Sequence, residues 1–176
     1  MAENNQHGER TSALCGHLAH SLGLEPEQCT KIEAASLLHD IGKAAIPQRI
    51  LDKPGRLTPD ERRELETHTT HGHRILSALE SEPVELAAIV ALTHHERWDG
   101  CGYPCGLAGE EIPIEARIVA VCDVFDALTN RRPYRPRPLT VTEATLEMRL
   151  ERGRAFDPEI LDAFLNVVSR RLRVAA

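Results

Sequence analysis

Apolar residues recur along the chain at intervals of three and four positions, which is the spacing of one face of an α-helix. No stretch shows the strict alternation of a half-buried strand. The first helical stripe consists of His7, Thr11, Leu14, Leu18 and Leu22, and it stops at Gly23. A second helix is predicted from Pro26 through Ile32, Ala35 and His39, with Gly42 as a left-handed residue that ends it. The pattern predicts an all-α protein.

The later helices have clear start signals. Residues 44–57 are predicted to be an irregular linker, and Thr58 to Glu61 form a capping box with Pro59 at the first helical position. The helix that follows carries one stripe of Leu65, His68, Gly72, Ile75 and Leu79. Further helices are expected over 83–95 and 114–129, then after Thr140 and after Asp157. The glycine- and proline-rich residues 99–113 are predicted to be a long functional loop in a helical bundle.

Composition narrows the class of protein. A chain of 176 residues with 41% hydrophobic and 27% charged residues fits one soluble domain, 1–176. It contains no apolar run of about 20 residues and no secretory segment, so we expect no membrane partner. The net charge of −6 argues against a nucleic-acid polymer as partner. Five cysteines, an odd number, favour the reducing cytoplasm, and Cys101 and Cys105 read as turn residues rather than as a redox or zinc pair.

Several histidines lie where a leucine would ordinarily pack. A single buried histidine is more often a hydrogen-bonded core residue than a metal ligand. Here His7, His39 and His68 come from separate helices, and further imidazoles and carboxylates accompany them: Asp40, His94, His95 and Asp123. Burying so many titratable groups without partners would cost several kcal/mol each. A shared cluster of divalent metals would satisfy them together, since such metals accept neutral imidazole and carboxylate ligands.

The positions of these residues suggest how metals would be shared. Asp40 directly follows His39, so its two oxygens could bridge two ions. Adjacent His94 and His95 point about 100° apart on a helix and could address different ions. Glu3, one turn before His7, is either a further ligand or a frayed terminal residue. Glu96 and Asp126 are candidates to orient a ligand imidazole.

A specific ordered set of motifs follows the chain. It comprises His39-Asp40-Ile41-Gly42-Lys43, His94-His95-Glu96, Gly102-Tyr103-Pro104, Asp123-Val124-Phe125-Asp126-Ala127-Leu128 and Arg132-Pro133-Tyr134-Arg135. The set resembles the HD-GYP domain, a subgroup of the HD phosphohydrolase superfamily that hydrolyses the bacterial second messenger cyclic di-GMP. The resemblance extends from Glu3 to about Phe164. It implies an HD-domain helical bundle and a phosphodiesterase that linearises cyclic di-GMP to pGpG, with GMP as a further product.

The resemblance also implies roles for individual residues. The metal ligands would be Glu3, His7, His39, Asp40, His68, His94, His95 and Asp123. The substrate would be held by Lys43, Tyr103, Arg132 and Arg135. Asp40 and Lys43 would carry the catalytic roles. Members of the family use clusters of two or three ions, with iron or manganese as the expected metals.

Other functions remain open at this point. The nearer one is an HD phosphohydrolase that acts on another cyclic dinucleotide or on a nucleotide. The other is a signalling scaffold that binds cyclic di-GMP without hydrolysing it. Candidate partners are a sensor or receiver domain, a diguanylate cyclase and a second copy of the chain in a homodimer. The sequence fits a free-standing protein and a piece of a larger regulator equally well.

Overall fold

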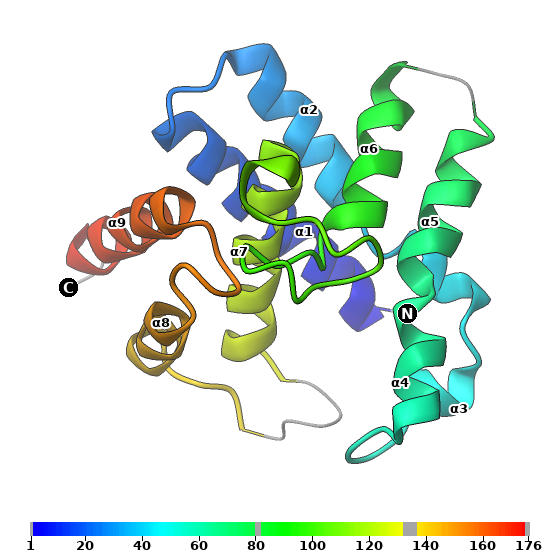
Figure 1. Cartoon of the computed structure of the whole chain (residues 1–176). Helices are drawn as coiled ribbons and strands as arrows, with labels where there is room; N and C mark the ends of the chain where they lie inside the picture. The colour runs from blue at the N-terminus through cyan, green and yellow to red at the C-terminus, as the bar shows by residue number, and fades with distance from the viewer. Residues whose placement is uncertain (1, 80–81, 132–136, 175–176) are drawn as a thin grey trace.

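The protein is helical throughout the part of the chain that the computed structural model describes, residues 2–79, 82–131 and 137–174, with side chains in 6–79, 84–131 and 137–170 (Figure 1). Within those ranges no strand is present. The α-helices are α1 (Ala2–Ser21), α2 (Pro26–Leu37), α3 (Gln48–Leu51), α4 (Pro59–Glu66), α5 (His68–Ser77), α6 (Glu82–Thr93), α7 (Ile114–Thr129), α8 (Val141–Leu150) and α9 (Pro158–Val174). Two short 3₁₀ helices are η1 (Ile41–Ala45) and η2 (Gly109–Glu111). The predicted all-α class is confirmed.

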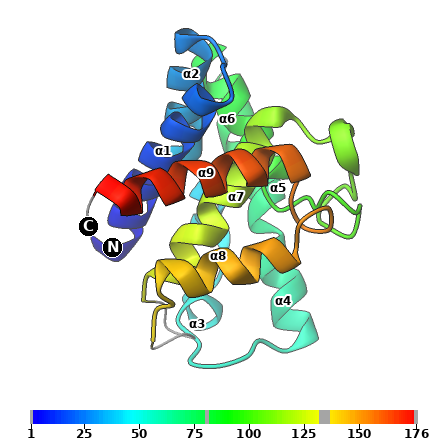
Figure 2. The ribbon, with the colours of Figure 1, turned by 90° about the vertical axis from the view of Figure 1, so that its left-hand side faces the viewer.

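Helix α7 runs through the centre of the bundle. Helix α1 packs against both α2 and α7, α2 packs against α6, and α6 packs against α5. Helices α8 and α9 cover the side of α7 that faces away from α5 (Figures 1 and 2). The long loop between α6 and α7 crosses the front of the bundle between α7 and α5 (Figure 1).

The core forms where α1, α2, α6, α7 and α9 meet. Leu18, Ile32, Val90, Ile118 and Phe164 contribute fully buried side chains from these five helices. Burial of a side chain of this size stabilises the fold by about 1.5–3 kcal/mol each. Cys15, Cys29 and Cys122 are buried among them, as expected for small apolar residues.

The predicted helix starts are confirmed. The Thr58 hydroxyl accepts a hydrogen bond from the Glu61 amide, and the Glu61 carboxylate accepts one from the Thr58 amide. Thr140 and Glu143 repeat this capping box at α8. Such caps satisfy backbone donors that would otherwise lack partners in the first turn of a helix.

Some predicted boundaries were wrong. Helix α2 ends at Leu37, so His39 and Asp40 lie in the turn that follows it. The expected linker 44–57 contains the end of η1 and the short helix α3. The single helix expected after Thr58 is broken at Thr67 into α4 and α5. Each break redirects the chain, which a continuous apolar periodicity does not reveal.

The predicted role of Gly42 was also wrong. Gly42 is not a left-handed stop; it lies in η1, which packs closely against α5. A Cβ atom at this position would lie 1.9 Å from the carbonyl oxygen of His68 and 2.4 Å from the amide nitrogen of Gly72. The glycine therefore allows η1 to approach the backbone of α5, and this approach brings Asp40 to His68.

Candidate metal centre

All predicted metal ligands except Glu3 come together from five separate segments of the bundle. His7 lies on α1 and Asp123 on α7, while His68 is the first residue of α5. His39 with Asp40, and His94 with His95, occupy the turns that follow α2 and α6. The expectation that His94 and His95 lie on a helix and point about 100° apart was therefore wrong, because α6 ends at Thr93.

The ligand atoms form two adjacent groups. The four-residue group contains Asp40, His68, His94 and His95, and the three-residue group contains His7, His39 and Asp123. Within each group the candidate ligand atoms lie within 4.8 Å of one another. The imidazole rings of His39 and His94, one from each group, have centroids 5.0 Å apart. The two groups therefore form one continuous centre.

Asp40 lies between the two groups. Its Oδ1 is 3.5 Å from Nε2 of His68 and 3.9 Å from Nε2 of His94, both in the four-residue group. Its Oδ2 faces the other way, 3.4 Å from Nε2 of His39. Asp40 thus has one oxygen toward each group, and the bridging of two ions by this carboxylate stays a prediction.

Three imidazoles are oriented by backbone carbonyls. Nδ1 of His39 donates to Ser36, Nδ1 of His68 donates to Leu65, and Nδ1 of His94 is shared between the carbonyls of Val90 and Ala91. A carbonyl only accepts hydrogen bonds, so the proton of each neutral ring is on Nδ1. Nε2 of each ring therefore presents its lone pair to the centre.

These inward atoms have no hydrogen-bond partner in the described part of the chain. They are Nε2 of His39, His68 and His94, together with Oδ1 of Asp40. The three histidines are only 1–2% exposed. Buried polar atoms without partners are rare in folded proteins, and each costs about 1–3 kcal/mol. A set of such acceptor atoms, all facing the interior of the two adjacent groups, fits divalent cations.

The electrostatics of the centre favour neutral imidazoles and ionised carboxylates. Burial lowers the pKa of His68 and His94, and burial lowers the pKa of His95 to about 4, so these rings are neutral near pH 7. Burial acts to raise the pKa of Asp40, but the facing His39, Lys43 and His94 outweigh it and hold the pKa well below its ordinary value. Neutral imidazoles and ionised carboxylates are the forms that bind metals.

Two predicted substrate residues lie at the edge of this centre. Nζ of Lys43 donates to Oδ2 of Asp40 at 2.5 Å, and about a third of the Lys43 side chain remains exposed. The Tyr103 ring stacks on the His95 ring, with centroids 4.8 Å apart and an interplanar angle of 29°. One face of Tyr103 is thus occupied by a candidate ligand, and stacking of a guanine on its other face stays a prediction.

Glu96 does not take the role suggested for it. Its carboxylate is buried and accepts hydrogen bonds from the backbone amides of Cys105 and Leu107, at 2.7 and 3.1 Å. The loop packs tightly here, because a Cβ atom on Gly102 would lie 2.5 Å from Cα of Glu96. Glu96 therefore anchors the loop that carries Tyr103, a role that the motif spacing alone did not reveal.

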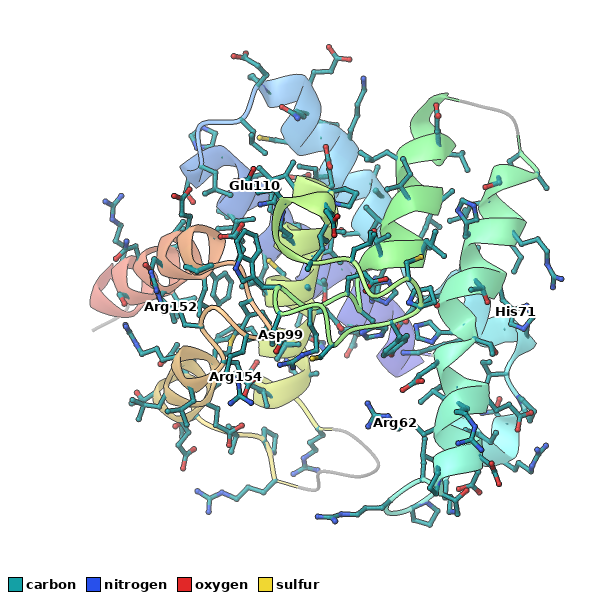
Figure 3. All side chains as sticks on the ribbon, in the orientation of Figure 1. Arg62, His71, Asp99, Glu110, Arg152 and Arg154 are labelled. Atoms are coloured by element: carbon teal, nitrogen blue, oxygen red, sulfur yellow. The ribbon has the colours of Figure 1, made fainter. Side chains whose placement is uncertain are left out.

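The segment after α8 braces the same loop from its other side. The amide of Asp99 donates to the carbonyl of Arg154, and these two residues lie beside each other in Figure 3. The amide of Trp98 donates to the carbonyl of Ala155, and the guanidinium of Arg97 bridges Asp99 and Glu151. The start of the loop is thus bonded to the segment between α8 and α9.

His7 is oriented by side chains rather than by a carbonyl. Its Nε2 is 3.1 Å from Oδ1 of Asp123, and its Nδ1 is 2.6 Å from Oδ2 of Asp126. Arg10 donates to both oxygens of Asp126 from Nε and Nη2. The predicted contact of Asp126 with a ligand imidazole is present, whereas Arg10 was not predicted.

Three predicted site residues are not placed. Arg132 and Arg135 lie outside the described residues, and so does the side chain of Glu3, whose backbone belongs to α1. Their roles stay predictions.

Cys101 and Cys105 are exposed, free thiols at the edge of the loop. In the described ranges, no helix has the length and apolar character needed to cross a bilayer.

Comparisons with known proteins show the family to which the chain is related. The HD domain family model matches residues 2–160. The chain is 50% identical over 166 residues to a cyclic di-GMP phosphodiesterase of Thermotoga maritima, covering 94% of this chain and 45% of that protein. It is 41% identical over 163 residues to the 3'3'-cGAMP-specific phosphodiesterase 2 of Vibrio cholerae, covering 93% of this chain and 31% of that protein.

A solved structure, described as an HDG"Y"P protein from Bdellovibrio bacteriovorus, has the same fold. It matches with a TM-score of 0.75 at 18% identity, over 94% of this chain and 52% of that one. The chain spans less than half the length of the two phosphodiesterases. The family and the fold that the motifs predicted are confirmed.

Proposed function

The chain belongs to the HD domain family, and from this premise we propose that it is a metal-dependent phosphodiesterase that hydrolyses cyclic di-GMP to pGpG, with GMP as a slower second product. One observation carries the proposal. Nε2 of His39, His68 and His94 and Oδ1 of Asp40 are buried, lack hydrogen-bond partners among the described residues and face one centre. The relative named a cyclic di-GMP phosphodiesterase, at 50% identity, supports this choice of substrate.

The donor atoms suit iron or manganese. The four-residue group would hold one ion and the three-residue group a second, with Asp40 shared between them. Glu3 would add a ligand to the three-residue group if a third ion binds. Two such ions, when bound, polarise phosphoryl oxygens and lower the pKa of a water molecule that serves as the nucleophile.

The chain's own residues would then position the phosphodiester. Lys43 places a partly exposed ammonium beside Asp40, where negative charge develops on the phosphoryl oxygens as the ribose 3′-oxygen departs. Arg132 and Arg135 would clamp the phosphates in the bidentate geometry that guanidinium groups favour. Tyr103 would present its free face to a guanine, held in place by His95 on its other face and by the Glu96 anchor of the loop.

A second substrate class has specific support. The Vibrio cholerae relative at 41% identity is named as specific for 3'3'-cGAMP. The two cyclic dinucleotides differ in one base, so the metal centre would act on either and the base contacts would discriminate. We assign Tyr103 and the two arginines to that choice, in favour of cyclic di-GMP.

The setting of the reaction is part of the proposal. The free thiols of Cys15, Cys29 and Cys122 are compatible with a reducing cytoplasm. A sensor or receiver domain, a diguanylate cyclase or a second copy of the chain would connect the enzyme to its signal.

Turnover by metal-loaded protein tests the proposal. Protein reconstituted with iron(II) or manganese(II) without oxygen is incubated in parallel with cyclic di-GMP and 3'3'-cGAMP, and the products are separated by chromatography. We expect pGpG to form fastest. Faster cleavage of 3'3'-cGAMP would transfer the assignment to that substrate. Binding of cyclic di-GMP without cleavage, by protein shown to contain its metals, would instead indicate a scaffold.

A further inference from the structure

We propose that Arg10 and Asp126 are positioning residues that make His7 a metal ligand, and that this pair sets the occupancy of the three-residue group. The inference rests on the proposed function, because it concerns ions that the phosphodiesterase would use. It adds two residues that act on the centre through His7 without touching the substrate.

The contacts form a ladder between α1 and α7. His7 and Arg10 are one turn apart on α1, and Asp123 and Asp126 are one turn apart on α7. Asp126 joins both residues of α1: Oδ2 is 2.6 Å from Nδ1 of His7, and Oδ1 accepts from Nε of Arg10 at 2.6 Å. Nε2 of His7 faces Oδ1 of Asp123, so it points into the three-residue group.

The Asp126 carboxylate is saturated with donors. Besides Arg10 and His7, it accepts from Nδ2 of Asn130 at 2.9 Å, and its side chain is only 2% exposed. Arg10 neutralises the buried charge with a two-pronged contact that fixes the plane of the carboxylate. That plane in turn fixes the orientation of the His7 ring, whose hydroxyl neighbour Thr11 is farther away at 3.4 Å.

Carboxylates face both nitrogens of His7, Asp126 at Nδ1 and Asp123 at Nε2. When an ion binds beside Asp123, Asp126 would hold the ring proton on Nδ1 and leave the lone pair of Nε2 to the ion. His39, His68 and His94 obtain this orientation from carbonyls of their own segments. Only for His7, among the described ligands, does a carboxylate 119 positions away supply it.

Asp126→Asn tests this assignment with almost no change in shape. The amide oxygen would face Arg10 and Asn130, so the amide nitrogen would face Nδ1 of His7 and donate to it. The proton of the neutral ring would then be on Nε2, where it blocks an ion. We expect the affinity of the three-residue group for manganese(II) to fall by about 10- to 100-fold, the usual effect of removing such a partner. The four-residue group should keep its ion.

Asp157→Asn is the matched control. Asp157 is also a buried carboxylate paired with an arginine of the same protein, since Oδ2 accepts from Nη1 of Arg117 at 2.6 Å. It touches none of the ligands in either group. Arg10→Lys and Arg10→Gln complete the series: lysine keeps the charge and loses the fork, so we expect it to retain more of the ion than glutamine.

The measurement is the number of manganese ions per chain after equilibrium dialysis, with the affinity of each from competition with a chelator. The inference predicts one ion fewer in Asp126→Asn at a concentration that saturates both the parent and Asp157→Asn. Equal ion number and affinity in Asp126→Asn and the parent would overturn it and leave the proposed function intact. Equal loss of bound manganese in Asp126→Asn and Asp157→Asn would also overturn it, because the loss would then reflect a general effect on stability. A parent protein that binds no ion would end both proposals.

Discussion

The two ligand groups of the candidate centre are held in different ways. In the four-residue group, His68 and His94 donate to carbonyls three or four positions earlier in the chain. In the three-residue group, His39 donates to a carbonyl in the same way, but His7 depends on Asp126, which is 119 positions away on another helix. The first kind of support forms with the local backbone. The second exists only after α1 has packed against α7.

This difference predicts that the two groups bind their ions with different affinities. The rings of His68 and His94 keep their orientation whenever their own segments are folded. A group oriented across helices is sensitive to anything that shifts α1, the helix that begins at the N-terminal end of the described chain. We expect the four-residue group to bind its ion more tightly and the three-residue group to be the adjustable one.

The largest effect should come from the residue that both groups share. Asp40→Ala removes the oxygens that face His39, His68 and His94, so both groups lose a ligand. We expect kcat to fall by about 10³-fold or more, equivalent to about 4 kcal/mol, with loss of bound metal. Elemental analysis and turnover measure this. Asp52→Ala, at an exposed aspartate paired with Gln48, is the control, and retained metal in Asp40→Ala would contradict the account.

Gly42→Ala should weaken metal binding by the four-residue group and leave the three-residue group little changed. The added Cβ would meet the backbone of His68 and Gly72, which cannot move aside as a flexible side chain would. We expect the free energy of unfolding to fall by about 3 kcal/mol and the four-residue group to lose affinity, while the contact of His7 with Asp126 persists. Denaturant unfolding and metal titration test both parts. In Gly8→Ala the new Cβ has ordinary contacts at 3.9–4.0 Å, so no comparable loss is expected.

Lys43→Gln should leave both groups intact and slow the chemistry. Its ammonium contacts Asp40 but supplies no metal-ligating lone pair while charged. We expect kcat to fall by about 10²-fold, the usual effect of removing one group that stabilises developing negative charge. Steady-state kinetics measures the fall in kcat, and elemental analysis measures the bound metal. The corresponding change at the Lys53–Glu61 pair, Lys53→Gln, should alter neither, and loss of metal from Lys43→Gln would reject its assignment.

The metal-free protein should lose stability in mild acid because of the four-residue group. Burial lowers the pKa of His95 to about 4, while an unfolded chain takes up that proton near pH 6.5. The contribution is therefore fully present above pH 6.5 and is lost as the pH falls toward 4, by about 2 kcal/mol at pH 5. Urea unfolding with a chelator present measures it. His95→Gln should flatten this slope, His20→Gln at an exposed site should not, and equal slopes would refute the prediction.

The smallest effect should come from the loop anchor, which lies outside both groups. Glu96→Gln replaces an acceptor of two backbone hydrogen bonds with a group that also donates. We expect a loss of about 1 kcal/mol in unfolding free energy and a several-fold rise in KM, because Tyr103 is less well held. The ion number should not change. Glu111→Gln alters an exposed contact with the Ala108 amide at the same loop and serves as the comparison.

Much of the fold could be predicted from local signals. Capping boxes mark where α4 and α8 begin, because they satisfy backbone donors within four residues of sequence, and α4 also has Pro59 in its first turn. The boundaries that failed depend on distant contacts. From the sequence alone, Gly42 is interpreted as the end of a helix. The structure shows instead that it allows close contact with the backbone of α5.

The site shows the same division. His39 and His68 were predicted as ligands because each occupies an apolar stripe, and the structure directs their Nε2 atoms into the candidate centre. Arg10 gave no such signal, since an arginine on a surface helix is ordinary until Asp126 is placed opposite. The role of Glu96 was not predicted for the same reason. Its partners are backbone amides of a folded loop, and the residue types of the loop do not indicate such contacts.

Anomalous diffraction from crystals of manganese-loaded protein tests the central claim most directly. The account predicts one peak enclosed by Asp40, His68, His94 and His95, and a second between His7, His39 and Asp123, with Asp40 contacting both. The absence of any peak among these side chains, in protein shown to be folded and saturated with manganese, would contradict it.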